Sequence, residues 1–532
     1  MKKTLALLLA VLLLFTAGCG SKPVEPQQTT SPTLSQEVQN AAGGYTFPTL
    51  EDDEVSQRED RDERPDIELV DLGEISKSKK IEDDDLKYVM IYNPYIYDDG
   101  RLSNGTLSTG DLDKQIVIDI DRADGLEEEP EMIPVGQDQI NTQPFSGTME
   151  DDRANAMSRE FKKGDTEEFY AFEDSGNLGF PRDKKEFTCA YAGKYCNIWV
   201  YDDAISDADA KTCAKEFDEN IYEQVVEKFG KPRFDGKVNL LYYPMPRNIG
   251  GCFANYDLLT EREVKYYDLE DIGCNTNVNL VHMSSRYGVE HPSSLSTMAH
   301  EFQHLICFTE AFGTADLTQC STWLNEAMSG YVEELIYPGV QYKAGRMTSY
   351  MDSDLIRYGQ SLYNFETTGL DIGVYGSVYL YAMYLEQLAG EDVFADVHKY
   401  WRTSYSDTLD EPEALVNAVP KKVYKAVDES VTYPEDIVEK NFNCEDEVWM
   451  SKLTLQFYLD ILDEDDSDPA DFRNVRPRAL LYDQYDSAKI EGGGRVIIEL
   501  EDDTFEIPKK AGKGLIYVAL DEDFNVLSIS YN

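Results

Sequence analysis

The central part of the chain alternates short apolar runs with a longer stretch of helical periodicity. The apolar runs predict buried strands, at residues 197–201, 238–243 and 278–282. Residues 208–229 repeat apolar positions at helical spacing and stop at Gly230, as a helix does. Two or three more helices are expected before Trp401. Strands and helices mixed in this way predict an α+β domain with a mixed sheet.

The two flanks of this part show a different pattern. On the N-terminal side, apolar runs such as residues 88–92 alternate with Gly, Asn and Asp turns, which predicts a β-rich region. On the C-terminal side, a helix near residues 448–462 is followed by two strands and a final hairpin. The expected folded regions are therefore residues 76–187, 188–405 and 406–532.

The first 19 residues have the features of an export signal. Two lysines precede an unbroken apolar run at residues 5–15, which is too short to span a bilayer but typical of a secretory signal peptide. Small residues then lead to Cys19, a pattern that resembles a bacterial lipobox and implies a lipidated cysteine. Thr16 stands where Leu is usual, so ordinary secretory cleavage remains an alternative. Residues 20–75 are polar and acidic and predict a linker between the anchor and the folded body.

Composition narrows the choice of partners. The 532 residues include 49 Lys and Arg against 102 Asp and Glu, which gives a formal net charge of −53. Hydrophobic residues make up 42% of the chain, enough to exclude global disorder. Such an acidic surface argues against nucleic acid and against basic-patch docking on anionic lipid. The lipid anchor is therefore the one membrane contact we expect, with the body in the cell envelope and facing outward.

Histidine is rare, yet two of its five occurrences form a His300-Glu301-x-x-His304 motif. Residues four apart on a helix lie on the same face, so both imidazoles can bind one ion. An apolar stripe around the motif predicts a helix, which Ser293 or Ser294 can cap. Glu301 lies about 100° round the helix from His300, within reach of a metal-bound water.

A catalytic zinc ion needs a third protein ligand. The sequence Trp-Leu-Asn-Glu at residues 323–326 offers Glu326, which follows His304 by 22 positions, enough for a loop and a second antiparallel helix. Glu333 lies seven residues further, on the same helix face, where it can accept the outer N–H of a ligand histidine. The alternative for Glu333 is a solvated helix carboxylate.

These two motifs together carry a family resemblance. His-Glu-x-x-His followed by Trp-Leu-Asn-Glu resembles the gluzincin metallopeptidases, and most of all the hyicolysin family of bacterial secreted metalloproteases, over roughly residues 189–401. The resemblance implies a zincin-like domain in which His300, His304 and Glu326 hold Zn²⁺. It also implies that Glu301 is the general base.

A later stretch adds a further candidate by resemblance. Tyr375 precedes the sequence Tyr-Leu-Glu-Gln-x-x-Gly at residues 384–390, similar to aminopeptidase-N-like gluzincins, although Val378 replaces their glycine. The implied role of Tyr375 is to donate its hydroxyl to the tetrahedral oxyanion, and a buried core tyrosine is the alternative. The chain has no Gly-x-Met-Glu-Asn segment, which favours an endopeptidase. Gly330 stands where thermolysin-like enzymes carry an Asp, so the contact with the outer N–H of a ligand histidine is left to Glu333.

The other histidines and the cysteines carry weaker signals. His282 and His291 are candidates to line the cleft, whereas His398 is expected to be structural. Apart from Cys19, the chain has eight cysteines, an even number that permits disulfides in an exported protein. A Cys307–Cys320 bridge and buried free thiols are the two alternative interpretations.

The sequence thus predicts an extracellular, lipid-anchored, zinc-dependent peptidase that hydrolyses protein or peptide substrates through a zinc-activated water. An alternative from another class is a catalytically inactive, zincin-fold binding or adhesion lipoprotein at the cell surface. The complete ligand set together with Glu301 favours the enzyme, because a fold that had lost its chemistry would usually lack one of these groups.

Overall fold

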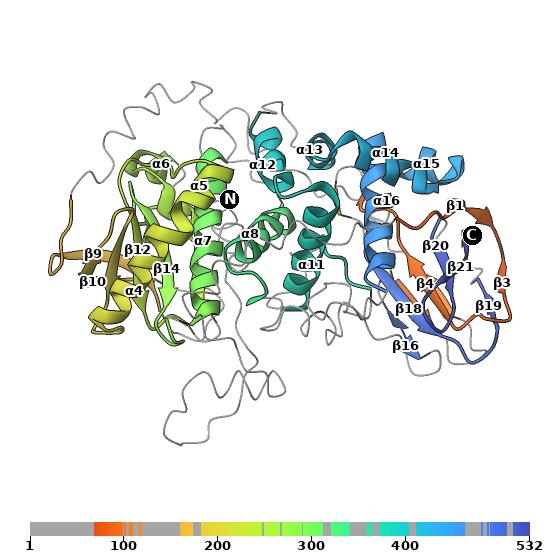
Figure 1. The fold of residues 1–532 in the computed structure, drawn as a ribbon, viewed down its shortest axis with the longest axis horizontal. Helices are drawn as coiled ribbons and strands as arrows, with labels where there is room; N and C mark the ends of the chain where they lie inside the picture. Colours follow the sequence, from red (N-terminus) through yellow and green to blue (C-terminus); the bar gives the residue numbers. More distant parts are fainter. Residues whose placement is uncertain are drawn as a thin grey trace, which may run out of the picture. The chain divides into compact units, whose positions relative to one another are not determined.

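A computed structural model describes the chain in segments, which form two compact units (Figure 1). Unit 1 takes the described residues within Gln143–Ser321 and Asn325–Gly345, and unit 2 takes those within Pro65–Thr142, Thr322–Leu324 and Arg346–Asn532. The described residues are 69–98, 101–102, 106–109, 116–119, 160–173, 182–246, 249–266, 269–289, 291–311, 321–340, 350, 359–363, 372–403, 411–462, 480–481, 487–488, 490–507 and 514–531.

Unit 1 is built on a six-stranded sheet with the order β13-β14-β12-β11-β10-β9. Its strands are β9 (Thr166–Phe172), β10 (Arg182–Ala192), β11 (Cys196–Val200), β12 (Val238–Tyr243), β13 (Gly251–Cys252) and β14 (Asn279–Ser284). The neighbours β11, β12 and β14 are parallel, whereas β9, β10 and β13 pair antiparallel, so the sheet is mixed. Every residue of β11, β12 and β14 is buried, which explains their continuous apolar runs.

The expected helix at residues 208–229 is present as three consecutive helical segments, α4 (Asp207–Glu216), the π-helix η3 (Phe217–Ile221) and α5 (Tyr222–Phe229). Ser206 and Asp209 close the start of α4 with reciprocal hydrogen bonds. Phe217 and Tyr222, at the two ends of the π turn, both contact the ring of Phe302, with centroids 4.9 and 5.5 Å away. The irregular turn thus anchors the helix that carries the histidine motif.

That helix, α7 (Pro292–Ala311), packs on β13 and β14. The expected serine caps are wrong, because the helix already begins at Pro292, whose missing N–H suits the first helical position. The preceding residue, His291, serves instead: its Nδ1 accepts from the backbone N–H of Ser293 at 3.3 Å. His291 is therefore a helix-terminus residue.

The following helix, α8 (Thr322–Ile336), is tied to α4 at its far end. The Tyr337 hydroxyl, just past the end of α8, donates to Glu216 at 2.7 Å. The first three residues of α8 group with unit 2, where Trp323 meets Tyr363 edge to face with centroids 4.8 Å apart. The aromatic residue of the Trp-Leu-Asn-Glu sequence is therefore a core residue.

Unit 2 joins strands from both flanks of the sequence in one sheet, with the order β16-β18-β4-β20-β21-β2. Its strands are β2 (Ser76–Lys77), β4 (Tyr88–Tyr92), β16 (Leu480–Leu481), β18 (Arg495–Glu499), β20 (Ile516–Leu520) and β21 (Val526–Tyr531). The N-terminal strand β4 lies between the C-terminal strands β18 and β20. The two β-rich flanks thus share a sheet, and the expected boundary at residue 187 falls inside β10. Hydrophobic alternation identifies a strand but does not identify its partner.

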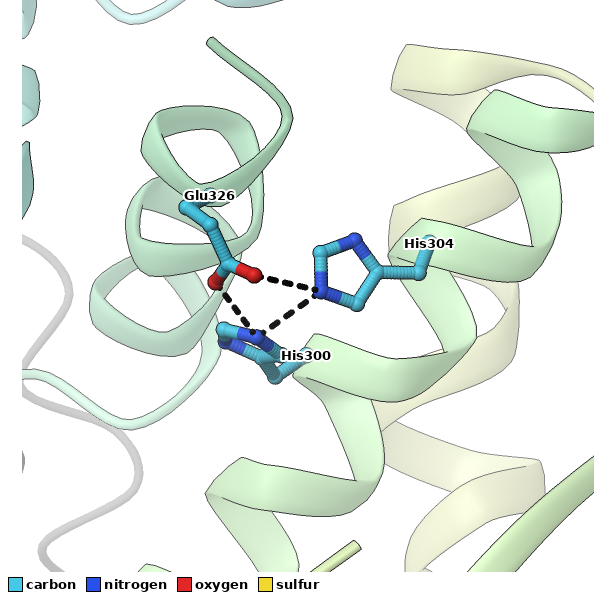
Figure 2. A group of neighbouring side chains, drawn as sticks. All are labelled: His300, His304 and Glu326. Atoms are coloured by element: carbon cyan, nitrogen blue, oxygen red, sulfur yellow. Dashed lines mark hydrogen bonds and ion pairs between the residues drawn. The ribbon is translucent and has the colours of Figure 1, made fainter. Parts of the chain in front are cut away.

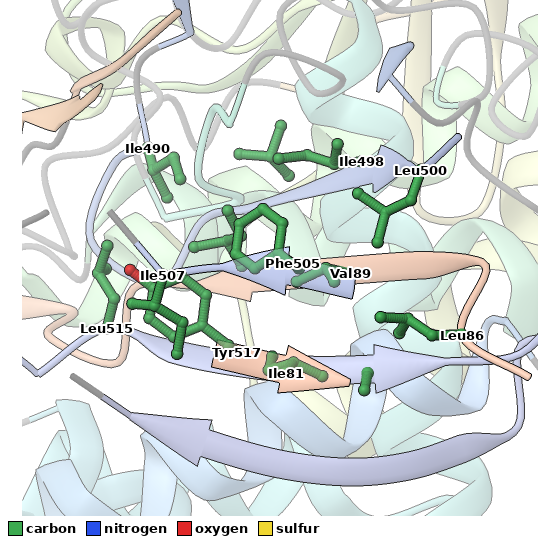
Figure 3. Close-up of a cluster of buried hydrophobic side chains, with 13 residues drawn as sticks. Ile81, Leu86, Val89, Ile490, Ile498, Leu500, Phe505, Ile507, Leu515 and Tyr517 are labelled. Carbon is green, nitrogen blue, oxygen red and sulfur yellow. The ribbon is translucent and has the colours of Figure 1, made fainter. Parts of the chain in front are cut away.

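Alternate residues of this sheet face a common apolar cluster (Figure 3). The cluster also takes Ile81 and Phe505 from the pair β3 (Lys80–Glu82) and β19 (Thr504–Glu506). On the opposite face, Tyr92 donates its hydroxyl to the backbone oxygen of Ser451 at 3.0 Å. Ser451 belongs to a helix, and β4 is therefore buried on both faces.

Among the described residues, the helices of unit 2 are α11 (Ile372–Ala389), α12 (Val393–Thr403), α13 (Glu411–Ala418), α14 (Lys421–Ser430), α15 (Glu435–Asn441) and α16 (Glu445–Asp460). The last of these, α16, corresponds to the helix that the sequence predicts near residues 448–462. Across the described ranges, no helix combines the length and the hydropathy that a bilayer crossing requires.

Unit 1 buries a cluster of charged side chains beside its sheet. Arg182 and Asp257 form two parallel hydrogen bonds of 2.9 and 2.7 Å, and each side chain is 1% exposed. His282 lies 3.0 Å from Asp257 through Nε2, and its Nδ1 lies 3.1 Å from the Tyr243 hydroxyl. His282 is thus enclosed in the protein interior, and the expectation that it lines a cleft is not supported by its position.

This enclosure links stability to pH. Burial lowers the pKa of His282 below its usual value of 6.5, despite the hydrogen bond to Asp257. The unfolded chain therefore binds a proton at a higher pH than the folded one, so this contribution to stability is complete above pH 6.5 and declines below it. Asp257 acts in the same direction at lower pH. Burial alone would raise its pKa, but Arg182 outweighs burial and lowers the pKa from 3.8 to about 2.

We predict that the free energy of unfolding of the wild-type protein falls more steeply between about pH 7.5 and pH 5 than that of His282→Gln. Glutamine keeps a polar group at this position but does not titrate, so the variant lacks the histidine contribution. Urea denaturation at a series of pH values measures the difference. Parallel pH dependences for the two proteins would show that His282 titrates alike in the folded and unfolded states.

Candidate metal centre

The two histidines of the motif lie one turn apart on α7 and point to the same place (Figure 2). His300 Nε2 and His304 Nε2 are 3.0 Å from each other, and both side chains are buried. The spacing of four residues on a helix brings the two rings together. Two imidazole nitrogens therefore converge on one point inside unit 1.

Glu326 reaches the same point from α8 (Figure 2). Its Oε2 lies 3.2 Å from His300 Nε2, and its Oε1 lies 3.6 Å from His304 Nε2. One ligand atom from each residue falls within 4.8 Å of the others, and no other such group of three occurs among the described residues. Two imidazoles and one carboxylate form a donor set that suits Zn²⁺. The residues present therefore fit a zinc ion.

Glu333 contacts the outer nitrogen of His300. Its Oε1 lies 3.2 Å from His300 Nδ1, and both side chains are almost fully buried. A proton on Nδ1, held by this carboxylate, leaves the lone pair of Nε2 free to bind a metal ion. The structure thus puts Glu333 where the sequence spacing expects it.

Ser329 contacts the outer nitrogen of His304, and sequence reasoning missed it. Its Oγ lies 3.0 Å from His304 Nδ1 and donates to Gln303 Oε1, which can only accept. Because the Ser329 proton goes to Gln303, its oxygen accepts from the Nδ1–H of His304. This fixes the tautomer that presents Nε2 to a metal ion. The available signal was its position one turn after Glu326 on α8.

Glu301 lies beside these groups and is held by the edge strand. Its Oε2 accepts from the backbone N–H of Phe253 at 2.8 Å, whereas its Oε1 has no hydrogen-bond partner within the described part of the chain. Gly251 packs directly on it: a Cβ atom there would lie 2.9 Å from both Glu301 Cγ and Thr297 Cγ2. Only glycine lets β13 approach α7 this closely. The motif alone did not predict either Gly251 or Phe253.

The ionisable groups shift one another strongly. Burial would lower the pKa of His300, but Glu333 and Glu326 outweigh burial and raise that pKa to about 10. Burial, together with His300, lowers the pKa of His304 well below its usual range. Burial raises the pKa of Glu301 to about 8, against the opposing charge of His300. Two carboxylates therefore favour positive charge around His300, and one of them, Glu326, lies where the Nε2 atoms meet, which suits a divalent cation.

The remaining candidates lie elsewhere. Tyr375 is buried in the first turn of α11, which belongs to unit 2, so its role stays a prediction. His398 is buried in α12. Cys307 is buried in α7, whereas Cys19 and Cys320 lie outside the described residues.

We predict that Ser329→Ala weakens the binding of added Zn²⁺ by about 10- to 100-fold, because His304 loses the group that orients its ring. Competition with a chromogenic chelator measures the affinity. Ser430→Ala is the matched control, since Ser430 is also a buried, hydrogen-bonded helix serine but belongs to unit 2. Equal affinities for Ser329→Ala and wild type would remove Ser329 from the support of the site.

Comparison with known proteins finds a similar metalloprotease. The chain is 30% identical over 251 residues to the neutral metalloprotease ShpI of Staphylococcus hyicus. The similar region covers 44% of this chain and 53% of that protein, so the chain spans about half the length of the curated relative. No protein-family model matches the chain. The relationship to metallopeptidases that the two sequence motifs predict is confirmed by this similarity.

Proposed function

We propose that the protein is a zinc-dependent peptidase, with the metal held by His300, His304 and Glu326. The observation that carries the proposal is the convergence of these three buried ligand atoms from two helices. The similarity to a neutral metalloprotease supports the same activity. Together these observations favour the enzyme over a binding protein that keeps the fold without turnover.

The donor set supports zinc over calcium and magnesium. Imidazole suits zinc, and calcium and magnesium prefer oxygen ligands. Three protein ligands leave one coordination position for water or substrate, as in catalytic zinc sites. When bound, zinc supplies a Lewis acid that polarises the scissile carbonyl and lowers the pKa of a water molecule.

Glu301 is the proposed general base. Its buried carboxylate takes a proton from the attacking water and passes it to the nitrogen of the departing amine. The Phe253 amide holds Oε2, so Oε1 is the oxygen we assign to the proton transfer. One carboxylate can serve both steps, because the proton that Glu301 takes from the water is the proton that it later releases.

Three finer features belong to the same proposal. The catalytic part is proposed to be zincin-like and to cleave within protein or peptide chains. Tyr375 is proposed to donate a hydrogen bond to the oxyanion, on the strength of its sequence resemblance. The body is proposed to lie outside the cytoplasm, anchored through a lipid on Cys19, on the strength of residues 1–19 alone.

We predict that Glu301→Gln retains zinc but loses at least about 10²-fold in peptidase activity, because glutamine cannot take the proton. Glu326→Ala is expected to lose both zinc and activity, because it removes one of three ligands. Metal analysis of the purified proteins and hydrolysis of casein measure the two effects.

We predict that Tyr375→Phe keeps zinc and loses about 10- to 10³-fold in activity, because the variant lacks the hydroxyl proposed to donate to the oxyanion. The same two measurements test it.

Two results would contradict this proposal. If Glu301→Gln digests casein as fast as wild type, the activity does not arise at this site. If wild type loaded with zinc shows no hydrolysis, even after limited proteolysis of the N-terminal region, the binding-protein alternative replaces the peptidase.

We predict that Cys19→Ala moves the protein from the membrane fraction to the medium or the soluble envelope fraction. The reason is that a single lipid-modified cysteine is the proposed membrane attachment. Fractionation followed by immunoblotting measures the change. Unchanged membrane association of the variant would contradict the lipobox interpretation.

A further inference from the structure

A short stretch of unit 1 connects the two buried ionic groups described above. The β13–η4 segment, residues 251–258, comprises β13 and the 3₁₀ helix η4 (Asn255–Leu258). Phe253, within it, donates its backbone N–H to Glu301 Oε2 at 2.8 Å. Asp257, four residues further, is the carboxylate of the buried charged cluster. The segment thus contacts the candidate general base at Phe253 and the buried charged cluster at Asp257.

Both carboxylate oxygens of Asp257 have partners in the interior. Its Oδ1 accepts from Arg182 at 2.9 Å and from the backbone N–H of Asn275 at 2.7 Å. Its Oδ2 accepts from Arg182 at 2.7 Å and faces His282 Nε2 at 3.0 Å. Arg182 in turn donates to the backbone oxygens of Gly273 and Tyr170, at 2.9 and 3.1 Å. The carboxylate is therefore fixed against several parts of unit 1 at once.

His282 holds the other end of the same segment. In the antiparallel pairing of β13 with β14, Cys252 is the partner of His282. One residue of β14 therefore pairs through its backbone with the start of the segment and contacts Asp257 through its ring. Because β13 pairs over only two residues, the ladder alone is a short attachment. The ring is held on both sides, because Nδ1 lies 3.1 Å from the Tyr243 hydroxyl and Nε2 lies 3.0 Å from both Asp257 and Arg182.

We propose that Arg182, Asp257 and His282 are positioning residues that hold the Phe253 amide on Glu301. Buried ion pairs contribute little net stability, since desolvation offsets their attraction, so stability alone does not account for this cluster. The placement of the cluster accounts for it, because its residues contact both ends of the β13–η4 segment. The Phe253 amide in this segment orients the Glu301 carboxylate. The consequence for turnover rests on the proposed function of Glu301, whereas the consequence for the Phe253 amide does not.

Two variants test the positioning. Asp257→Asn keeps the size of the side chain but removes the charge that Arg182 contacts. Tyr243→Phe is milder, because it keeps every charge of the cluster and removes one hydroxyl, which contacts His282 Nδ1 and accepts from the backbone N–H of Phe172. The control is Asn239→Ala, which loses buried hydrogen bonds from Asn197 and Trp199 and one to the backbone oxygen of Asn279, all outside the β13–η4 segment.

The measurements use the full-length, zinc-loaded protein. Hydrogen–deuterium exchange of the peptide that contains Phe253 should quicken by about 10-fold or more in Asp257→Asn, because the Phe253 amide is no longer held against its acceptor Glu301. In the same variant kcat should fall about 10- to 100-fold with KM and zinc content unchanged, as expected for a misplaced reacting group. Tyr243→Phe should change both quantities in the same direction by less. The control should unfold at a lower temperature but keep wild-type kcat and exchange at Phe253.

The outcomes separate this proposal from the peptidase proposal. Wild-type exchange at Phe253 in folded Asp257→Asn overturns the positioning role, whatever the activity. If Asp257→Asn does not fold, Tyr243→Phe decides by the same criterion. If wild type has no peptidase activity, the proposed function fails, and the exchange rates alone decide whether the cluster positions the amide. If Asp257→Asn and Asn239→Ala lower kcat by the same factor, the cluster contributes only to general stability and does not position the amide.

Discussion

The burial of ionisable side chains between α7 and α8 is the constraint on which the candidate metal centre depends. A buried charge without a partner costs several kcal/mol, so each group must meet a complementary one. His300 lies between Glu326 and Glu333, and His304 meets Ser329. The packing of the two helices has to supply these partners within hydrogen-bond distance. The same arrangement fixes both ring orientations, so what satisfies the buried charges also prepares the site for a metal ion.

The scaffold that holds this arrangement is the mixed sheet of unit 1. Its central strands are buried throughout, and α7 packs against the β13–β14 edge. Phe302, which directly follows Glu301, is held by two rings around the π turn η3. Gly251 brings β13 close enough for a backbone amide to reach Glu301. The reactive side chains are therefore positioned by the helix and by the strand edge together, and both are parts of one hydrophobic core.

Unit 2 depends on a different kind of contact. Its main sheet pairs β4, near the N-terminal end of the described chain, with β18 and β20 near the C-terminal end. Contacts between residues so far apart in sequence carry a loop-closure cost, which slows folding. The sheet is complete only when both flanks are available. The two flanks of the central region are therefore one structural element, although they differ in sequence and surround unit 1 along the chain.

Local periodicity determined the parts of this protein that involve one element at a time. The helical spacing put His300 and His304 on one face of α7, and it put Glu326 and Glu333 on one face of α8. The sequence also identified the buried strands, because continuous apolar runs mark burial on both faces. What it did not determine was contact between separate elements. Ser329 opposite His304, the Phe253 amide on Glu301 and the Arg182–Asp257 pair arise from packing between segments, and a pattern along one segment carries no record of its neighbour.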